Sequence, residues 1–335
     1  MPEPSPASPG RRRGRLFRFG AALVVLLSVA GYLAVQYITG GTGARGCKVV
    51  SGRADDAVYE FTPEQAANAA TIAAVGTGRD LPERAVTIAL ATSLQESGLR
   101  NIGHGDRDSL GLFQQRPSQG WGTEKQIMDP TYAADIFYEH LVKVRGYTKL
   151  PLTVAAQRVQ RSGYPTAYAK HEPDATLLSA ALTGTSAATL TCDGRPAATS
   201  AAGPDAVRSA LVRDFGRDVL EPAGAAVSGA GSTPSPASTP SASEDESGSG
   251  SGGRTVILPV TGDKGGGKGD PADRSLRQRG WQLAHWAVAN ASALHIQRVT
   301  YGGRQWTAGN TDSQWRPAKA AAGSDAGAVR ILTAQ

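Results

Sequence analysis

Residues 82–117, PERAVTIALATSLQESGLRNIGHGDRDSLGLFQQRP, decide the fold of this chain. Pro82 suits a first helical turn, because its missing N–H would be unpaired there anyway, and Gly98 suits a helix stop. Between them, residues at spacings of three and four share one face that is apolar except near Glu96. They are Ala85, Ile88, Ala89, Thr92, Glu96 and Leu99. The stretch predicts a helix ending beside a glutamate, then a polar loop and a strand over 111–115.

Glu96 is the candidate catalytic residue of this stretch. A carboxyl group on a core-facing stripe is costly to ionise, so we expect the pKa of Glu96 to rise. A carboxylic acid that stays protonated near neutral pH is what a glycosidase needs as its general acid. The alternative is a solvent-facing glutamate at a helix end, and its place on the apolar stripe argues against that.

The N-terminal region predicts a membrane anchor. We expect residues 1–19 to form a disordered basic tail. Residues 20–38, GAALVVLLSVAGYLAVQYI, contain a single strongly polar side chain. At about 1.5 Å per residue this run spans roughly 28 Å, close to the bilayer core. Because the arginines come first, we expect a cytoplasmic N-terminus, a single-pass helix in the cell membrane, and the bulk of the chain outside. A cleaved signal peptide is the alternative, although the run is long for one.

The net charge and its distribution limit the classes of partner that the sequence predicts. The net charge is +6 over 335 residues, and the basic cluster lies beside the apolar run. No basic patch with interleaved aromatic residues follows, so we expect no nucleic-acid partner. Protein partners cannot be named from the sequence.

Two cysteines, Cys47 and Cys192, both lie on the predicted outer side. An even count in an oxidising compartment predicts a disulfide, with two free thiols as the alternative. The enclosed loop of 192 − 47 = 145 positions would stabilise the fold by about 4–5 kcal/mol before strain.

The periodicity predicts an α+β chain in several parts. A mainly helical domain spans 47–192, with Thr62, Pro63 and Gln65 as a capping box for a helix to about 75, and further helices starting near Pro130, over 152–160 and over 175–182. An amphipathic helix over 204–220 precedes a Gly/Ser/Pro linker over 222–253. A small α+β module over 254–335 has strands near 254–260, 296–301, 305–307 and 329–332 and a helix over 276–294.

Two motifs resemble a known family. LATSLQESGLRN at 90–101 and SLGLFQQRPSQGWG at 109–122 are similar to the lysozyme-like domain of goose-type lysozymes and soluble lytic transglycosylases. Glu96-Ser97-Gly98 matches the Glu-Ser-Gly that ends a helix in that family, and residues 111–114 match the Gly-Leu-Met/Phe-Gln strand after it. The resemblance covers about residues 60–185.

This resemblance implies a reaction on the glycan strands of peptidoglycan. Glu96 would protonate the β-1,4 glycosidic oxygen between N-acetylmuramic acid and N-acetylglucosamine. It would then take the proton of the muramic C6 hydroxyl, which closes a 1,6-anhydro ring without water. Gln114 would border the sugar groove. The other implied substrate-binding residues are Ser97, Ser109, Gln115 and Tyr164.

The sequence also departs from the family. Its members usually carry Ala-Tyr-Asn-Ala-Gly on a later helix, whereas residues 155–164 here lack a Tyr-Asn pair. Gln157, Gln160 or Tyr164 could replace it. Two alternatives therefore stay open: a muramidase that uses Asp106 or Asp108 as a second carboxylate, and a non-catalytic, membrane-anchored wall-binding or scaffold protein.

We expect no metal and no cofactor. The DRDSLG stretch at 106–111 has Leu110 where a calcium loop needs an oxygen ligand, and His104 is a lone histidine. In the C-terminal module, Trp286 and Trp306 are expected to fill the core, while Trp281 and Trp315 could serve the core or an aromatic platform. This module resembles C-terminal regions of uncharacterised secreted actinobacterial proteins, which implies no known activity.

Overall fold

The computed structural model describes residues 46–53, 55–164, 166–194, 203–220, 254–260, 271–309, 314–318 and 327–334. These residues all fall in one compact unit spanning 45–335. The predicted tail, the apolar run over 20–38 and the linker over 222–253 lie outside the described residues. Within the described part, no helix has both the length and the apolar character needed to cross a bilayer.

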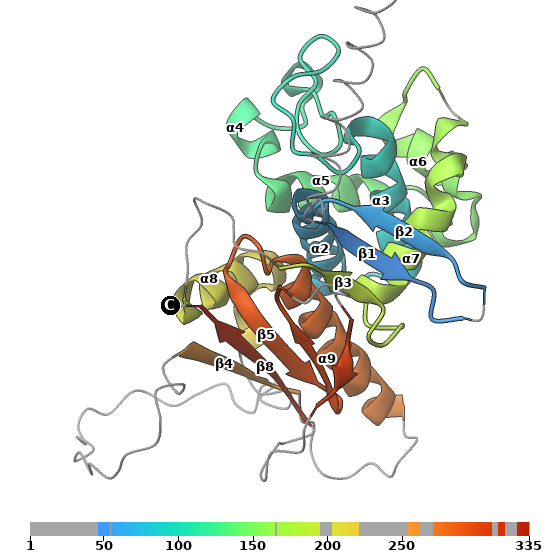
Figure 1. Ribbon diagram of the computed structural model, residues 1–335. Coiled ribbons are helices and arrows are strands. Elements are labelled where there is room, and N and C mark those ends of the chain that lie inside the picture. Colours follow the sequence, from blue (N-terminus) through green and yellow to red (C-terminus); the bar gives the residue numbers. More distant parts are fainter. Residues whose placement is uncertain are drawn as a thin grey trace, which may run out of the picture. The chain divides into compact units, whose positions relative to one another are not determined.

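Helices surround a central helix in the first half of the chain (Figure 1). The central helix is α3 (Glu83–Ser97), which contacts α2 (Pro63–Gly78), α5 (Pro130–Val142), α6 (Leu152–Gln160) and α7 (Glu172–Leu182). A short α4 (Glu124–Ile127) and 3-10 helices over Pro117–Gln119, Tyr147–Lys149 and Ala167–His171 join them. Every residue from Ala85 to Leu94 is buried, so α3 is enclosed on all sides rather than along the single stripe that the spacing predicts.

The start of α2 follows its sequence signal, and its end does not. Thr62 accepts from the backbone N–H of Gln65 while the Gln65 side chain accepts from the Thr62 N–H, which confirms the predicted capping box. The helix continues past residue 75 to Gly78. Gly76 lies inside it because the Tyr138 ring packs there; a Cβ at residue 76 would be 2.6 Å from the Tyr138 Oη.

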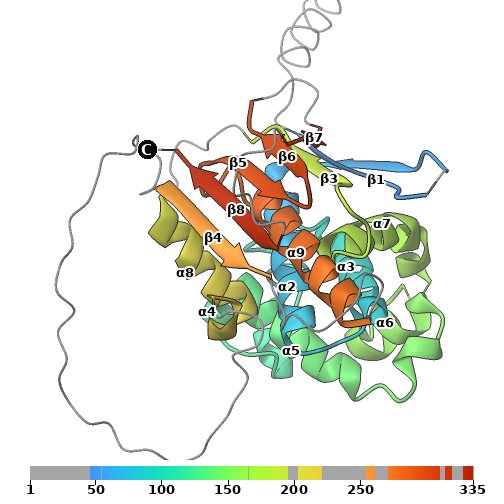
Figure 2. The same ribbon diagram turned by 90° about the horizontal axis from the view of Figure 1, so that it is seen from below.

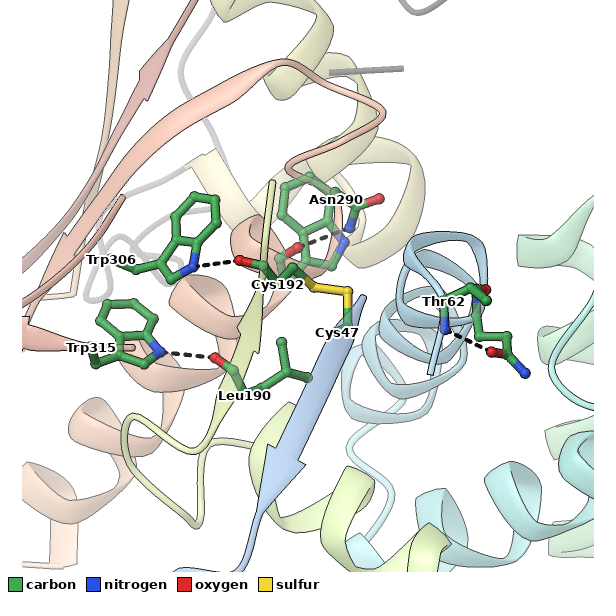
Figure 3. Close-up of a disulfide and its surroundings, with 9 residues drawn as sticks. Cys47, Thr62, Leu190, Cys192, Asn290, Trp306 and Trp315 are labelled. Carbon is green, nitrogen blue, oxygen red and sulfur yellow. Dashed lines mark hydrogen bonds between the residues drawn. A yellow bond between two sulfur atoms is a disulfide. The ribbon is translucent and has the colours of Figure 1, made fainter. Parts of the chain in front are cut away.

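A three-stranded antiparallel sheet closes the helical part at its two chain ends. Its order is β2 (Val58–Phe61), β1 (Cys47–Val50), β3 (Leu190–Cys192). Cys47 and Cys192 face each other in the register, with Cα atoms 4.0 Å apart, and form the predicted disulfide. Figure 3 shows this bond.

A five-stranded antiparallel sheet forms most of the C-terminal module, in the order β4-β8-β5-β6-β7. The strands are β4 (Thr255–Pro259), β5 (Ile296–Tyr301), β6 (Arg304–Thr307), β7 (Arg316–Pro317) and β8 (Ala328–Thr333). Helix α9 (Pro271–Ala289) contacts β5 and β8 (Figure 2). Before the linker, α8 (Pro204–Phe215) gives way at Gly216 to a 3-10 helix over Arg217–Leu220, so the predicted 204–220 helix is broken. The α+β prediction is confirmed.

Two tryptophans of the C-terminal module donate hydrogen bonds to backbone carbonyls on the outer edge of β3. The indole N–H of Trp306 donates to the Cys192 carbonyl at 3.0 Å, and that of Trp315 donates to the Leu190 carbonyl at 2.8 Å. Both indoles point at the strand in Figure 3. Because β3 is an edge strand, these carbonyls have no partner strand, and the indoles replace one.

Two buried polar residues also join the helical part of the chain to the segments that follow it. Asp214 on α8 accepts from the Thr71 hydroxyl of α2 and from the Trp286 indole of α9, while His285 is bonded to residues 181 and 189. The buried apolar side chains of the helical part and those of the C-terminal module belong to one hydrophobic cluster. All four tryptophans of the module are buried, including Trp281 and Trp315.

Candidate active site

The end of α3 fixes the position of Glu96. Gly98 takes a left-handed conformation (φ 63°), and its N–H donates to the Leu94 carbonyl, which ends the helix as predicted. Two side chains of α2 then bind the carbonyls beyond the end. Gln65 donates to the Gly98 carbonyl and Asn68 to the Leu99 carbonyl, both at 2.8 Å. The backbone around Glu96 is therefore held from two helices.

Residues 111–115 form a tight turn, and the predicted strand there is wrong. Leu110 and Gln115 exchange backbone hydrogen bonds of 2.9 and 3.0 Å, which closes the four residues between them into a reversal. Gly111 (φ 73°) and Gln114 (φ 48°) both adopt positive φ. A Cβ at residue 111 would lie 2.7 Å from the Ile127 carbonyl oxygen, so only glycine permits this approach.

Serine hydroxyls attach this turn to the helix that carries Glu96. Ser93 and Ser97 both donate to the Leu112 carbonyl, at 3.0 and 2.8 Å. Ser97 also accepts from the Arg100 N–H and is 5% exposed. The structure thus gives Ser97 an internal role, connecting the two motifs.

Glu96 contacts a buried tyrosine across the site. The Tyr168 hydroxyl, on the 3-10 helix over 167–171, donates to the Glu96 Oε1 at 2.6 Å. Burial raises the pKa of Glu96, the predicted direction, and hydrogen bonds from Tyr168 and Gln160 oppose that rise without cancelling it. Burial, and then the neighbouring Glu96, raise the pKa of Tyr168, so its hydroxyl keeps its proton. Glu96 itself stays partly exposed.

Gln160, the last residue of α6, completes this group. It donates to the Phe113 carbonyl at 2.7 Å, and its side chain also lowers the pKa of Glu96. Gln160 was one of three candidates for the missing Tyr-Asn pair. Gln157 instead donates to the Ser162 carbonyl. The site therefore joins α3, the 111–115 turn, the end of α6 and Tyr168, which the sequence prediction did not include.

The other predicted substrate-binding residues occupy different settings. Gln114 is partly exposed and donates to the Gly111 carbonyl at 3.2 Å. Gln115 is 2% exposed and donates to the Ala133 carbonyl, while Ser109 is buried. Tyr164 is 77% exposed, on the loop between Gln160 and Tyr168. Gln114 and Tyr164 are thus the two of this set with side chains open to a ligand.

The two loop aspartates differ in their contacts. Asp108 accepts from the Arg116 guanidinium at 2.7 Å and from the Ser118 N–H at 2.9 Å. The side chain and the N–H of Ser118, and then Arg116, hold the pKa of Asp108 well below its usual range. Asp106 has a side chain 93% exposed and lies 4.0 Å from Arg107. The Asp108 carboxylate therefore holds the loop in its conformation. Among the described residues, no group of three or more possible metal ligands comes together.

Comparison with known proteins finds a similarity in the C-terminal module and not around Glu96. Residues 266–328 match a family model described as VldE, C-terminal domain. No curated protein matches the chain. The match covers all of α9, strands β5 to β7 and the first residue of β8, and it does not reach Glu96. The similarity of residues 60–185 to the lysozyme-like family, and that of the module to secreted actinobacterial proteins, stay predictions from sequence.

Proposed function

We propose that this protein is a membrane-anchored lytic transglycosylase that cleaves the β-1,4 bond between N-acetylmuramic acid and N-acetylglucosamine in peptidoglycan. The observation that carries the proposal is Glu96: a single carboxyl group of raised pKa, at a helix end, held by a buried tyrosine. The anchor is residues 20–38, and residues from 46 onward face the wall.

Glu96 has the properties that both proton transfers need. In its neutral form it donates a proton to the glycosidic oxygen as the bond from the muramic C1 breaks. The carboxylate left behind then accepts the C6 hydroxyl proton as that oxygen bonds to C1, so no water is consumed. Tyr168 is a positioning residue, because its hydrogen bond fixes Oε1 and stabilises the carboxylate between the two steps.

The surrounding contacts support a single-carboxylate mechanism over a muramidase. An inverting hydrolase needs a second carboxylate free to activate water. Asp108 is bonded to Arg116 and to the Ser118 N–H, so its oxygens are occupied by the loop. Asp106 remains the only one of the two candidates with an open carboxylate, which makes it the informative control.

Digestion of purified peptidoglycan by the full chain tests the proposal. We expect soluble fragments with anhydro ends, which are lighter by one water than reducing ends in mass analysis. Glu96→Gln should abolish release while still sedimenting with insoluble peptidoglycan, and Asp106→Asn should release anhydro fragments like the original protein.

Three results would contradict the proposal in distinct ways. If the unsubstituted protein released fragments with reducing ends and Asp106→Asn did not, the protein would be a muramidase. Binding without release by the unsubstituted chain would indicate a wall-binding protein. Undiminished release by Glu96→Gln would show that the acid is elsewhere.

A further inference from the structure

A cavity of about 510 Å³ lies far from Glu96 in the sequence, between the C-terminal module and the segment that leads into β3. Helix α9, the β5–β6 turn and that segment each contribute walls. The principal lining residues are Arg277, Trp281, Tyr301, Arg304, Ala187 and Ala188. The volume falls within the roughly 300–1,000 Å³ typical of small-molecule sites.

The charged groups of this cavity are all cationic. Arg277 and Arg304 are exposed, and neither guanidinium has an ion pair within the part of the chain that the structure describes. Other arginines do: Arg84 pairs with Glu172 at 2.6 Å and Arg116 with Asp108 at 2.7 Å. The lining contains no aspartate or glutamate. Two planar N–H forks therefore line the same space, and neither has an ion-pair partner among the described residues.

A buried indole adds a third donor. Trp281 is 5% exposed, and across the described ranges its N–H has no hydrogen-bond acceptor. The edge of the ring lies along Gly302, another lining residue; a Cβ there would be 3.7 Å from the indole nitrogen. The other tryptophans of the module all donate to protein oxygens, namely Trp286, Trp306 and Trp315. Because the ring edge borders the lining at Gly302, a ligand in the cavity can accept a hydrogen bond from this N–H.

Close backbone contacts hold the cavity walls in place. Gly280 allows the Tyr301 ring to lie on α9, since a Cβ there would be 2.0 Å from the ring. Tyr301 in turn packs edge-on against Trp281, with ring centroids 5.3 Å apart. Gly184 approaches the backbone of α9 so closely that a Cβ would be 1.8 Å from the Gln278 carbonyl oxygen. The donors are therefore presented from packed elements.

We propose that this cavity binds an oxyanion, a carboxylate or a phosphate, carried by a small organic group. Guanidinium forks match the geometry of both anions and bind them bidentately. The indole N–H donates a further hydrogen bond, and the rings of Trp281 and Tyr301 with the methyl groups of residues 187 and 188 receive the apolar part of the ligand. This site is independent of the reaction proposed for Glu96.

The test follows Trp281 directly in the full chain labelled with 5-fluorotryptophan. The chain has five tryptophans, so the ¹⁹F spectrum has five resonances, and Trp281→Phe assigns one of them. Titration uses N-acetylalanine as the carboxylate probe and glycerol phosphate as the phosphate probe, each against sodium chloride of equal ionic strength. We expect the Trp281 resonance to shift saturably with at least one probe, and the better probe identifies the anion.

Substitutions separate this site from general salt effects. Arg277→Gln and Arg304→Gln should each weaken the binding about tenfold or more, the value of a charged hydrogen bond. Arg279→Gln, on the same helix but outside the lining, should leave it unchanged. The other four resonances report that each variant is folded. A shift that sodium chloride reproduces, that fails to saturate with both probes, or that survives both arginine substitutions would overturn the proposal.

Discussion

Acidification should loosen the contact between the module and the helical part through His285. This side chain is fully buried, and both its ring nitrogens are bonded. Nδ1 lies 2.7 Å from the Ala181 carbonyl and donates to it, while Nε2 accepts from the Thr189 N–H at 3.2 Å. A proton added at Nε2 would face another N–H donor. The site therefore accepts the neutral ring and resists the charged one.

The size of the effect follows from the pKa of His285. Burial lowers it from 6.5 to about 4, with the Ala181 carbonyl opposing that change. The unfolded chain then binds the proton between these two pH values and the folded chain does not, so stability falls as the pH decreases. The fall starts near pH 6.5 and is nearly complete by pH 4. At about 1.4 kcal/mol per pH unit, it amounts to roughly 3 kcal/mol.

Urea unfolding of the full chain between pH 7.5 and pH 4 measures this loss. His285→Asn is the comparison, because an amide can still donate toward Ala181 but does not titrate. The variant should be less stable at pH 7.5, and the gap should close by roughly 3 kcal/mol toward pH 4. Other titrating groups contribute to both proteins and cancel in the difference. Parallel stability curves for the two proteins would refute the reasoning.

Three further predictions concern the site and its support. Tyr168→Phe should raise the pKa of Glu96 further, because it removes a hydrogen bond that lowers it; carbon NMR of labelled glutamate would detect the change, and a fall would contradict it. Replacing Cys47 and Cys192 together by alanine should cost about 5 kcal/mol by the chain-entropy relation, measured by urea unfolding, where an unchanged midpoint would argue against it. Trp306→Phe should cost about 1–3 kcal/mol by leaving the Cys192 carbonyl unpaired, and a calorimetric transition at the original temperature would show that another group takes its place.

Local signals predicted the elements well. Gly98 ends α3 because glycine accepts the left-handed conformation, and Thr62 starts α2 because its hydroxyl reaches the Gln65 N–H. Both effects act within a few residues, so the sequence contains the whole cause. The helix over 152–160 was predicted with its observed bounds for the same reason. Cys47 and Cys192 could be paired because no other cysteine competes.

Contacts distant in sequence were not predicted. The sequence predicts a strand over 111–115, but these residues form a turn. Gly111 lies so close in it to the Ile127 carbonyl, from another segment, that only glycine fits, and no local pattern shows this contact. Tyr168 reaches Glu96 across 72 positions, and its position between two alanines in a polar stretch was the only local sign of burial. The sequence does not decide the role of Trp315, because its indole N–H donates to a β3 carbonyl that no sequence pattern identifies.

The disulfide also determines how the protein would carry a mechanical load. It joins residues 145 positions apart whose Cα atoms are separated by 4.0 Å, next to the points where the chain enters and leaves the helical segment. Tension applied between residues before Cys47 and residues after Cys192 would therefore pass through one covalent bond and bypass α3. In the proposed setting, tension between the bilayer and anything bound to the C-terminal module would leave the geometry around Glu96 unchanged.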